Sequence, residues 1–305
     1  MLAFGLVGPN APVAKYEFAD FFAGDAAIST GMRLLGFNGC TFDLRTDLNH
    51  NLMVPVGFLA ALVTCMSIKR GGLVWFAPPC STWVWMSRHS TGRTNSVEGD
   101  VNNANVQAQN YLVRRLVHLL TLLIKRGVYF IIEQPRSSVM WEHPAMKKFL
   151  SRWNSLIDTA ENQIGAHNLE NRKDTILKGW APHLKSKRLN RKMTKQERAW
   201  MADGNTKATT VYWKEGATKR SRGTKHLKST QSYPVSFGCS HALAFKDLDS
   251  EMDEPPHLVG TDTEDSDSAD SCLNDILNND PEYFAGSASI AAGFVREQAV
   301  QAVRL

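Results

Sequence analysis

Two side chains that could do covalent and proton-transfer chemistry each stand where an apolar run of the sequence ends. Cys80 follows the pair Pro78-Pro79, in which both residues have a fixed φ and neither has a backbone N–H, and Glu133 closes a later apolar run. A thiol held there could act as a nucleophile, and a carboxyl group could hydrogen-bond to the group under attack. Each also has a plainer interpretation: a lone cysteine is usually a small core residue, and an acid at a strand end can cap or pair with a base.

A small-residue turn earlier in the chain could hold a ligand. Gly24 lies between an aromatic strand pattern and a helix pattern, and a strand, a tight turn and a helix N-terminus together form a cradle for a nucleotide-like ligand. Asp43 ends the next strand, 19 residues after Gly24, which is near the distance at which an acidic residue reaches a ribose hydroxyl. Many α/β domains share this pattern, and Asp43 could equally be a helix cap.

Taken in order, four segments resemble the cytosine-C5 methyltransferase family, whose members use S-adenosylmethionine. Asp-Phe-Phe-Ala-Gly at 20–24 resembles the family's Asp-Leu-Phe-Ala-Gly, and Ala-Pro-Pro-Cys at 77–80 resembles its Pro-Cys nucleophile loop. Ile-Glu-Gln-Pro at 132–135 resembles its Glu-Asn-Val element, and Tyr-Pro-Val-Ser-Phe-Gly at 233–238 resembles the closing segment that returns to the cofactor pocket. The resemblance covers roughly residues 16–245.

The resemblance implies a role for each matched residue. Cys80 would add to C6 of cytosine as a thiolate, helped by a lowered pKa, while Pro79 would shape its loop and Glu133 would hydrogen-bond N3. Phe22 would stack on the adenine of the cofactor, and Asp43 would hold its ribose. The target base would have to be flipped out of a duplex or already unpaired. The cofactor-binding positions implied are Asp20, Phe22, Ala23, Gly24, Asp43 and Pro78.

The chain also departs from the family pattern. Ala26-Ala27 stands where the family usually has Gly-Gly, so two methyl groups would crowd the methionine end of the cofactor. The family's Arg-x-Arg, which helps to hold the target base, has a partial match in which Arg172 or Lys173 would contribute and Asp174 has the wrong sign. Two alternatives therefore stay open: an inactive relative that binds S-adenosylmethionine or nucleic acid, and an RNA cytosine-C5 methyltransferase.

The net charge of the chain is only +5, but one segment is strongly basic and could bind nucleic acid. Residues 185–228 contain fourteen Lys and Arg against three acids, with Trp200, Tyr212 and Trp213 among them. The basic side chains would contact phosphates and the aromatic rings would stack on bases. DNA is the expected partner, and RNA is the alternative. A solvated surface or a nuclear-import run would have the same composition. The contacts that we expect are Lys185, Lys187, Arg188, Arg191, Lys192, Arg220, Arg222 and Lys225.

The C-terminal segment 249–305 is acidic and poor in aromatic residues, which predicts a disordered tail with a helix possible at 287–304. This tail could contact the basic insert or a protein partner. It could also be an inert solubilising segment.

The elements that must position these residues alternate between strand and helix. Strand patterns lie near 16–22, 38–43, 72–77 and 128–132, and helix patterns near 26–35, 55–69, 104–126 and 144–157. The alternation predicts an α/β fold with a mostly parallel sheet and helices on both faces. The resemblance implies that this fold is a Rossmann-like class I methyltransferase domain. The reactive residues would lie at the carboxyl ends of its strands. Trp83, Trp85 and Trp141 would either pack or line the base pocket.

Composition and the family resemblance together imply five parts of the chain. These are an N-terminal arm at 1–15, a cofactor-binding and catalytic core at 16–184, a basic insert at 185–228, a return segment at 229–248 and the tail at 249–305. Five cysteines without a Cys-x-x-Cys pair argue against a disulfide framework and a clustered metal site. We expect an intracellular protein without a membrane partner, nuclear if the basic run is an import signal and cytoplasmic if the host lacks a nucleus.

Overall fold

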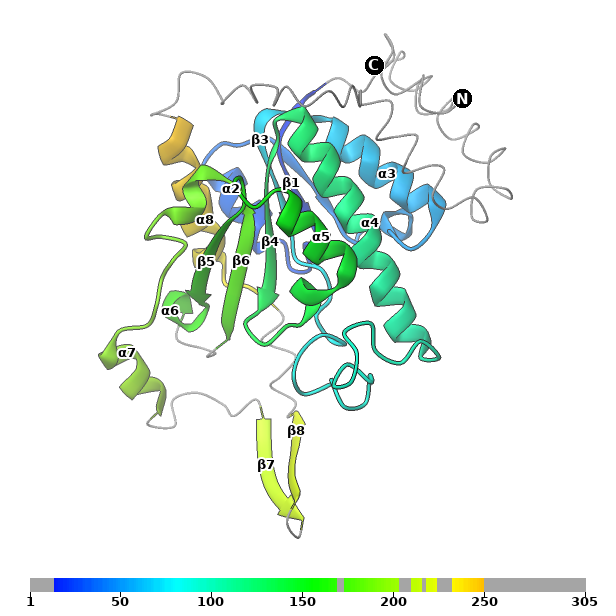
Figure 1. The fold of residues 1–305 in the computed structure, drawn as a ribbon. Helices are drawn as coiled ribbons and strands as arrows, with labels where there is room; N and C mark the ends of the chain where they lie inside the picture. The colour runs from blue at the N-terminus through cyan, green and yellow to red at the C-terminus, as the bar shows by residue number, and fades with distance from the viewer. Residues whose placement is uncertain (1–13, 169–172, 203–209, 216–217, 224–231, 250–305) are drawn as a thin grey trace.

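A six-stranded sheet forms the centre of the computed structural model, which describes residues 14–168, 173–202, 210–215, 218–223 and 232–249 (Figure 1). The strand order is β2-β1-β3-β4-β6-β5; β1 to β4 run parallel, and β6 is antiparallel to both of its neighbours. The strands are β1 (Tyr16–Phe21), β2 (Gly39–Phe42), β3 (Ile68–Phe76), β4 (Tyr129–Pro135), β5 (Asp158–Gln163) and β6 (Asp174–Trp180).

Helices cover both faces of this sheet. Figure 1 shows α3, α4 and α5 on one face and α2 with α8 on the other, and contacts join α2 to α8 and α4 to both α3 and α5. The longer helices are α2 (Ala27–Leu34), α3 (Pro55–Met66), α4 (Ala104–Arg126), α5 (Pro144–Arg152) and α8 (Val235–Asp249). The short ones are α6 (Gly165–Asn168), α7 (Lys195–Trp200) and the 3-10 turns η1 (Leu48–His50), η2 (Met140–Glu142) and η3 (Pro182–Lys185).

The central strands and helices form because local signals agree with burial. The central parts of β3 (73–76) and β4 (129–132) are apolar on both faces, as interior strands of a parallel sheet must be when helices cover both sides. The Asn103 side chain caps α4 by accepting hydrogen bonds from the backbone N–H groups of Asn105 and Val106. Gly127 ends α4 because a glycine adopts its left-handed backbone, with φ of 67°, without a steric cost.

The connections create a crevice above the middle of the sheet. From β1 the chain crosses to β2 on one side, and it then returns to form β3 on the other side of β1. Loops that leave β1 and β3 therefore diverge, and open α/β sheets bind ligands in the crevice at such a switch point. The expected Rossmann-like α/β fold with a mostly parallel sheet and helices on both faces is confirmed.

Several element boundaries differ from those expected. The helix expected at 55–69 ends at Met66, and β3 begins at Ile68 rather than near 72, because the side chain of Ile68 is buried in the core and its backbone pairs with β1. The basic insert contains a separate hairpin of β7 (Thr210–Glu215) and β8 (Thr218–Gly223), drawn at the bottom of Figure 1. The N-terminal residues 1–13 and the acidic tail from residue 250 lie outside the described residues.

Within the described ranges, we find no helix with both the length and the apolar character needed to cross a membrane.

Candidate functional site

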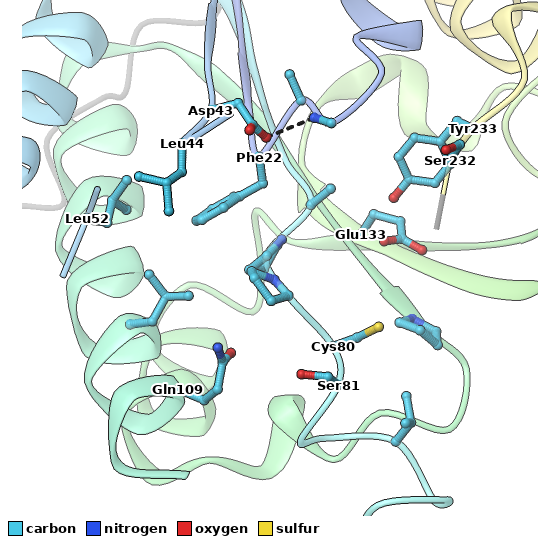
Figure 2. A pocket seen from close by; sticks show the side chains of 18 of the residues that line it. Phe22, Asp43, Leu44, Leu52, Cys80, Ser81, Gln109, Glu133, Ser232 and Tyr233 are labelled. Carbon is cyan, nitrogen blue, oxygen red and sulfur yellow. Dashed lines mark hydrogen bonds between the residues drawn. The ribbon is translucent and has the colours of Figure 1, made fainter. Parts of the chain in front are cut away.

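A large cavity opens at the carboxyl ends of the central strands. Its volume is about 1230 Å³, and loops from β1, β2, β3 and β4 line it together with α4, the residues before β6 and the residues before α8. Cys80 and Glu133 both line this cavity, although 53 residues separate them. Figure 2 shows their side chains directed into the same space, with Tyr233 beside Glu133. The expected convergence of thiol and carboxyl on one cavity is therefore what the structure shows.

The turn after β1 and the end of β2 form one wall of the cavity. Asp43 accepts hydrogen bonds from the backbone N–H of Gly24 at 2.9 Å through Oδ2 and from that of Arg45 at 2.7 Å through Oδ1. Both donors belong to the backbone, so they fix the orientation of the carboxylate. Gly24 adopts φ of +55°, which glycine tolerates best. Asp43 thus ties the two strand ends together at the cavity wall.

The same wall carries apolar groups suited to a flat ring. Phe22, Leu44 and Leu52 line the cavity beside Asp43, and Figure 2 shows the phenyl ring of Phe22 extending toward Leu44. An apolar wall next to a fixed carboxylate can contact a flat base and accept hydrogen bonds from ribose hydroxyls.

Three further residues expected to bind the cofactor behave differently from one another. Ala23 and Pro78 line the cavity. Asp20 does not: its carboxylate lies 1% exposed beneath the turn and accepts hydrogen bonds from the backbone N–H and the hydroxyl of Ser29. Burial raises the pKa of Asp20 to about 6. The expectation of direct cofactor contact is thus wrong for Asp20, because its side chain holds the start of α2 instead.

The pair Ala26-Ala27 also differs from expectation. Ala27 is buried and lines the cavity, so its methyl group does reduce the space there. Ala26 does not line the cavity; it adopts a left-handed backbone with φ of 55° at the N-terminus of α2. One of the two alanines rather than both therefore lines the cavity.

The nucleophile loop is anchored from β4. Gln134 is fully buried; its Nε2 donates to the carbonyl oxygen of Pro78 at 2.7 Å, and its Oε1 accepts from the Ser138 hydroxyl at 2.8 Å. This amide holds the loop before Cys80 against the strand that carries Glu133. Pro79, expected to shape the loop, is exposed at the cavity rim.

Cys80 is half-buried, and its acidity runs against expectation. Burial raises the pKa of the thiol above its usual value, the positive charge of Lys173 works against that rise, and the negative charge of Glu133 adds to it. The expected lowering of the pKa is thus wrong for this structure, because burial outweighs the neighbouring cation.

Glu133 is 3% exposed, and donors surround its carboxylate. Lys173 Nζ lies 3.2 Å from Oε1, the Thr175 hydroxyl donates to the same oxygen, and the Tyr233 hydroxyl also hydrogen-bonds to the carboxyl group. Burial and the charge of Glu133 hold the pKa of Tyr233 well above its usual value, so Tyr233 remains a donor.

Lys173 and Thr175 contact the carboxyl group of Glu133. Arg172 was expected, as a catalytic residue, to help hold the target base; it lies outside the described residues, so its role stays a prediction. The partial Arg-x-Arg match had indicated Lys173 as an alternative. Thr175 carried no sequence signal, because only the pairing of β6 with β4 brings it to Glu133.

Only one of the three nearby tryptophans lines the cavity. Trp85 is 46% exposed and forms part of the cavity wall. Trp83 is fully buried with the Arg93 guanidinium 3.4 Å from its ring centroid, and Trp141 is buried in the core. Packing therefore explains Trp83 and Trp141.

The basic residues expected to contact nucleic acid are spread over the surface. Lys192 pairs with Glu161 near the cavity end of β5, whereas Lys185 pairs with Asp158 at the opposite end of the same strand. Arg188 and Arg191 are also paired with acids, at 3.3 Å each, and Lys187 is exposed. Arg220 and Arg222 lie on β8, and Lys225 lies outside the described residues.

Comparisons with known proteins leave the family of this chain open. No family model matches the sequence, and no curated protein does either. A solved structure of the Entamoeba histolytica methyltransferase EhMeth is 13% identical with a TM-score of 0.37, and the match covers 55% of this chain and 54% of that one. The Dnmt2 methyltransferase of S. pombe is 14% identical with a TM-score of 0.34, covering 59% and 53%. The chain thus spans about half of each structure's length.

Proposed function

We propose that this protein transfers a methyl group from S-adenosylmethionine to C5 of cytosine in DNA, through a covalent adduct on Cys80. One observation carries the proposal: Cys80 and Glu133, from the tips of β3 and β4, line the same cavity as the fixed Asp43 carboxylate and Phe22. A potential nucleophile and an acid thus line one cavity, together with an aromatic ring and a fixed carboxylate that suit a nucleoside.

The residues at that wall suit the cofactor. Phe22 and Leu52 would hold the adenine between them, and Asp43 would accept hydrogen bonds from the ribose hydroxyls. When bound, S-adenosylmethionine supplies an electrophilic methyl group on a sulfonium. A cavity of about 1230 Å³ exceeds the usual volume of a small-molecule site, so it has room for a flipped base as well.

C5 of cytosine is a poor nucleophile by itself, and addition of Cys80 to the neighbouring C6 would make it a better one. The Cys80 thiolate would attack C6, so that an S–C6 bond forms and the electron pair of the C5–C6 double bond becomes available at C5. C5 would then form a bond to the methyl carbon as the bond from that carbon to the sulfonium sulfur breaks, so that S-adenosylhomocysteine leaves. Loss of the C5 proton to solvent would restore the double bond as the S–C6 bond breaks and Cys80 leaves as a thiolate.

Glu133 would stabilise the charge that the attack places on the ring. Addition of the thiolate makes N3 more basic, and a carboxyl group aimed at N3 can share a proton with it. The hydroxyl of Tyr233 and the ammonium of Lys173 fix the carboxyl group in place, the first by a hydrogen bond and the second by an ion pair. Removing the carboxyl group of Glu133 should slow the addition of the thiolate to C6.

A covalent trap tests the proposal. The full-length protein is incubated with S-adenosylmethionine and a DNA oligonucleotide that contains 5-fluorocytosine, from which the C5 substituent cannot leave as a proton. We expect a denaturation-resistant adduct with the wild type, none with Cys80→Ser and about a hundredfold slower formation with Glu133→Gln. Cys239→Ser is the matched control, because this half-buried cysteine lies away from the cavity lining and its loss should leave the adduct intact.

The same assay separates the alternatives. An adduct on RNA alone would keep methyl transfer and reject DNA as the substrate. The raised pKa of Cys80 and the Ala27 methyl group favour a second candidate, a binding module without turnover. S-adenosylhomocysteine binding without an adduct on either nucleic acid would support that module and reject the enzyme.

A further inference from the structure

The cavity brings together two groups that can both become anions. Glu133 is 3% exposed, and Cys80 is half-buried beside it. Two negative charges in a poorly solvated site repel one another, so a thiolate at Cys80 is costly while Glu133 is ionised. A nucleophile that must ionise there needs a cation close to both groups.

Three cations line the cavity within the described part of the chain, and one of them is much less exposed than the other two. The side chains of Arg45 and Arg136 are 64% and 61% exposed and pair with Asp25 and Glu161. The side chain of Lys173 is 14% exposed. Water and salt screen the charges of the two arginines, whereas the charge of Lys173 is screened less.

The contacts of the Lys173 ammonium group include an ion pair with Glu133 and a cation–π contact with Tyr233. The Nζ of Lys173 lies 3.2 Å from Oε1 of Glu133 and 4.9 Å from the centre of the Tyr233 ring. The charge of Lys173 is also the largest influence that opposes the raised pKa of the Cys80 thiol. The titratable groups that surround Cys80 are Glu133 of β4, Arg136 after β4, Lys173 and Asp174 at the start of β6, and Tyr233 before α8.

We propose that Lys173 is the positioning residue that favours ionisation of the Cys80 thiol, by neutralising the charge of Glu133 and attracting the sulfur anion. In this step the Cys80 proton leaves Sγ for water, its bonding pair stays on sulfur, and Lys173 keeps its own proton. The inference rests on the proposed role of Cys80 as the nucleophile.

Thiol alkylation measures this effect without cofactor or nucleic acid. The rate of Cys80 carboxamidomethylation by iodoacetamide is followed from pH 6 to 10 by mass spectrometry of the Cys80 peptide. We expect Lys173→Met to shift the midpoint upward by about one pH unit, which is about tenfold slower alkylation near neutral pH, and Lys173→Arg to stay near the wild type. Lys178→Met is the matched control: Lys178 lies on the same strand, half-buried over Trp141 and away from the cavity lining, and should change nothing.

A second pair of variants guards against misfolding. Lys173→Met alone leaves the buried Glu133 charge without its cation, which can destabilise the protein. The double variant Glu133→Gln with Lys173→Met avoids this, and its midpoint should still lie above that of Glu133→Gln alone. Wild-type alkylation profiles in Lys173→Met, or equal midpoints in the Glu133→Gln pair, overturn the proposal.

The two proposals fail separately. If the alkylation midpoint is the same in the wild type and in Lys173→Met, the role of Lys173 is rejected, and the outcome of the fluorocytosine trap is unaffected. A missing trap adduct rejects methyl transfer, whereas the alkylation profiles still report the acidity of Cys80.

Discussion

Phe22 and Ala26 each adopt a left-handed backbone, with φ of 60° and 55°, although neither is glycine. Such a conformation costs roughly 1–3 kcal/mol for a residue with a Cβ atom, and it persists only where the surroundings enforce it. Phe22 places its ring in the cavity, so its strain coincides with the candidate site. Ala26 lies outside the cavity lining, so its strained backbone does not belong to the candidate site.

Ala26→Gly should therefore stabilise the protein. Glycine adopts the left-handed conformation freely, and we expect the free energy of unfolding in urea to rise by about 1 kcal/mol. Ala27→Gly is the matched control, because Ala27 is the buried first residue of α2 and should lose about 1 kcal/mol instead. A less stable Ala26→Gly variant would show that the left-handed turn is not strained.

At the scale of elements, α8 completes the site by packing on α2. Glycines bring the two helices together: a Cβ on Gly238 would lie 2.0 Å from the carbonyl oxygen of Ala27, and one on Gly31 would lie 2.2 Å from the backbone of Gly238. Such contacts leave no space for a methyl group. Because Ser232 and Tyr233 directly precede α8, the crossing also sets their place in the cavity.

Gly238→Ala should push the two helices apart. We expect the free energy of unfolding in urea to fall by roughly 2 kcal/mol or more, because the backbone of α2 cannot move as a flexible side chain would. Ser240→Ala on the same helix is the control and should change stability by less than about 0.5 kcal/mol, since its hydroxyl bonds only within α8. Equal stability of the two variants would argue against the close crossing.

At the scale of the whole molecule, α8 is also joined to the sheet through buried histidines. His241 of α8 stacks on His183 of η3, with 5.1 Å between ring centroids, and lies 4.7 Å from the Trp75 ring of β3. Burial lowers the pKa of His241 to about 4, and it lowers the pKa of His183 as well. Both rings are therefore neutral in the folded protein near neutral pH.

Stability should fall as the solution is acidified from about pH 6.5 toward 4. In that window the unfolded chain takes up a proton on His241 and the folded chain does not, so acid favours unfolding. The difference corresponds to roughly 3 kcal/mol for His241 once the pH reaches 4. Thermal unfolding between pH 4 and 8 should show a shallower decline for His241→Phe than for the wild type. Parallel curves would mean that His241 is not responsible.

Much of the fold followed from local sequence. The four apolar runs at β1 to β4 and the helices between them were predictable because each carries its own periodicity and end signals, such as Gly127 after α4. The strands β5 and β6 were not predicted. Their residues alternate between buried and more exposed positions, so neither strand is an apolar run, and β6 pairs with β4 across about 40 residues.

The sequence alone determined which groups could react: Cys80 after its two prolines, Glu133 at a strand end, and Asp43 after the turn. Each stands at the end of a local pattern, and local patterns can be read from neighbouring residues. Only the tertiary structure decided that Lys173 and Thr175 meet Glu133, and that Asp20 turns away from the cavity. The pairing of β6 with β4 joins residues about 40 positions apart, and such long-range contacts depend on how the whole sheet packs rather than on any short stretch of sequence.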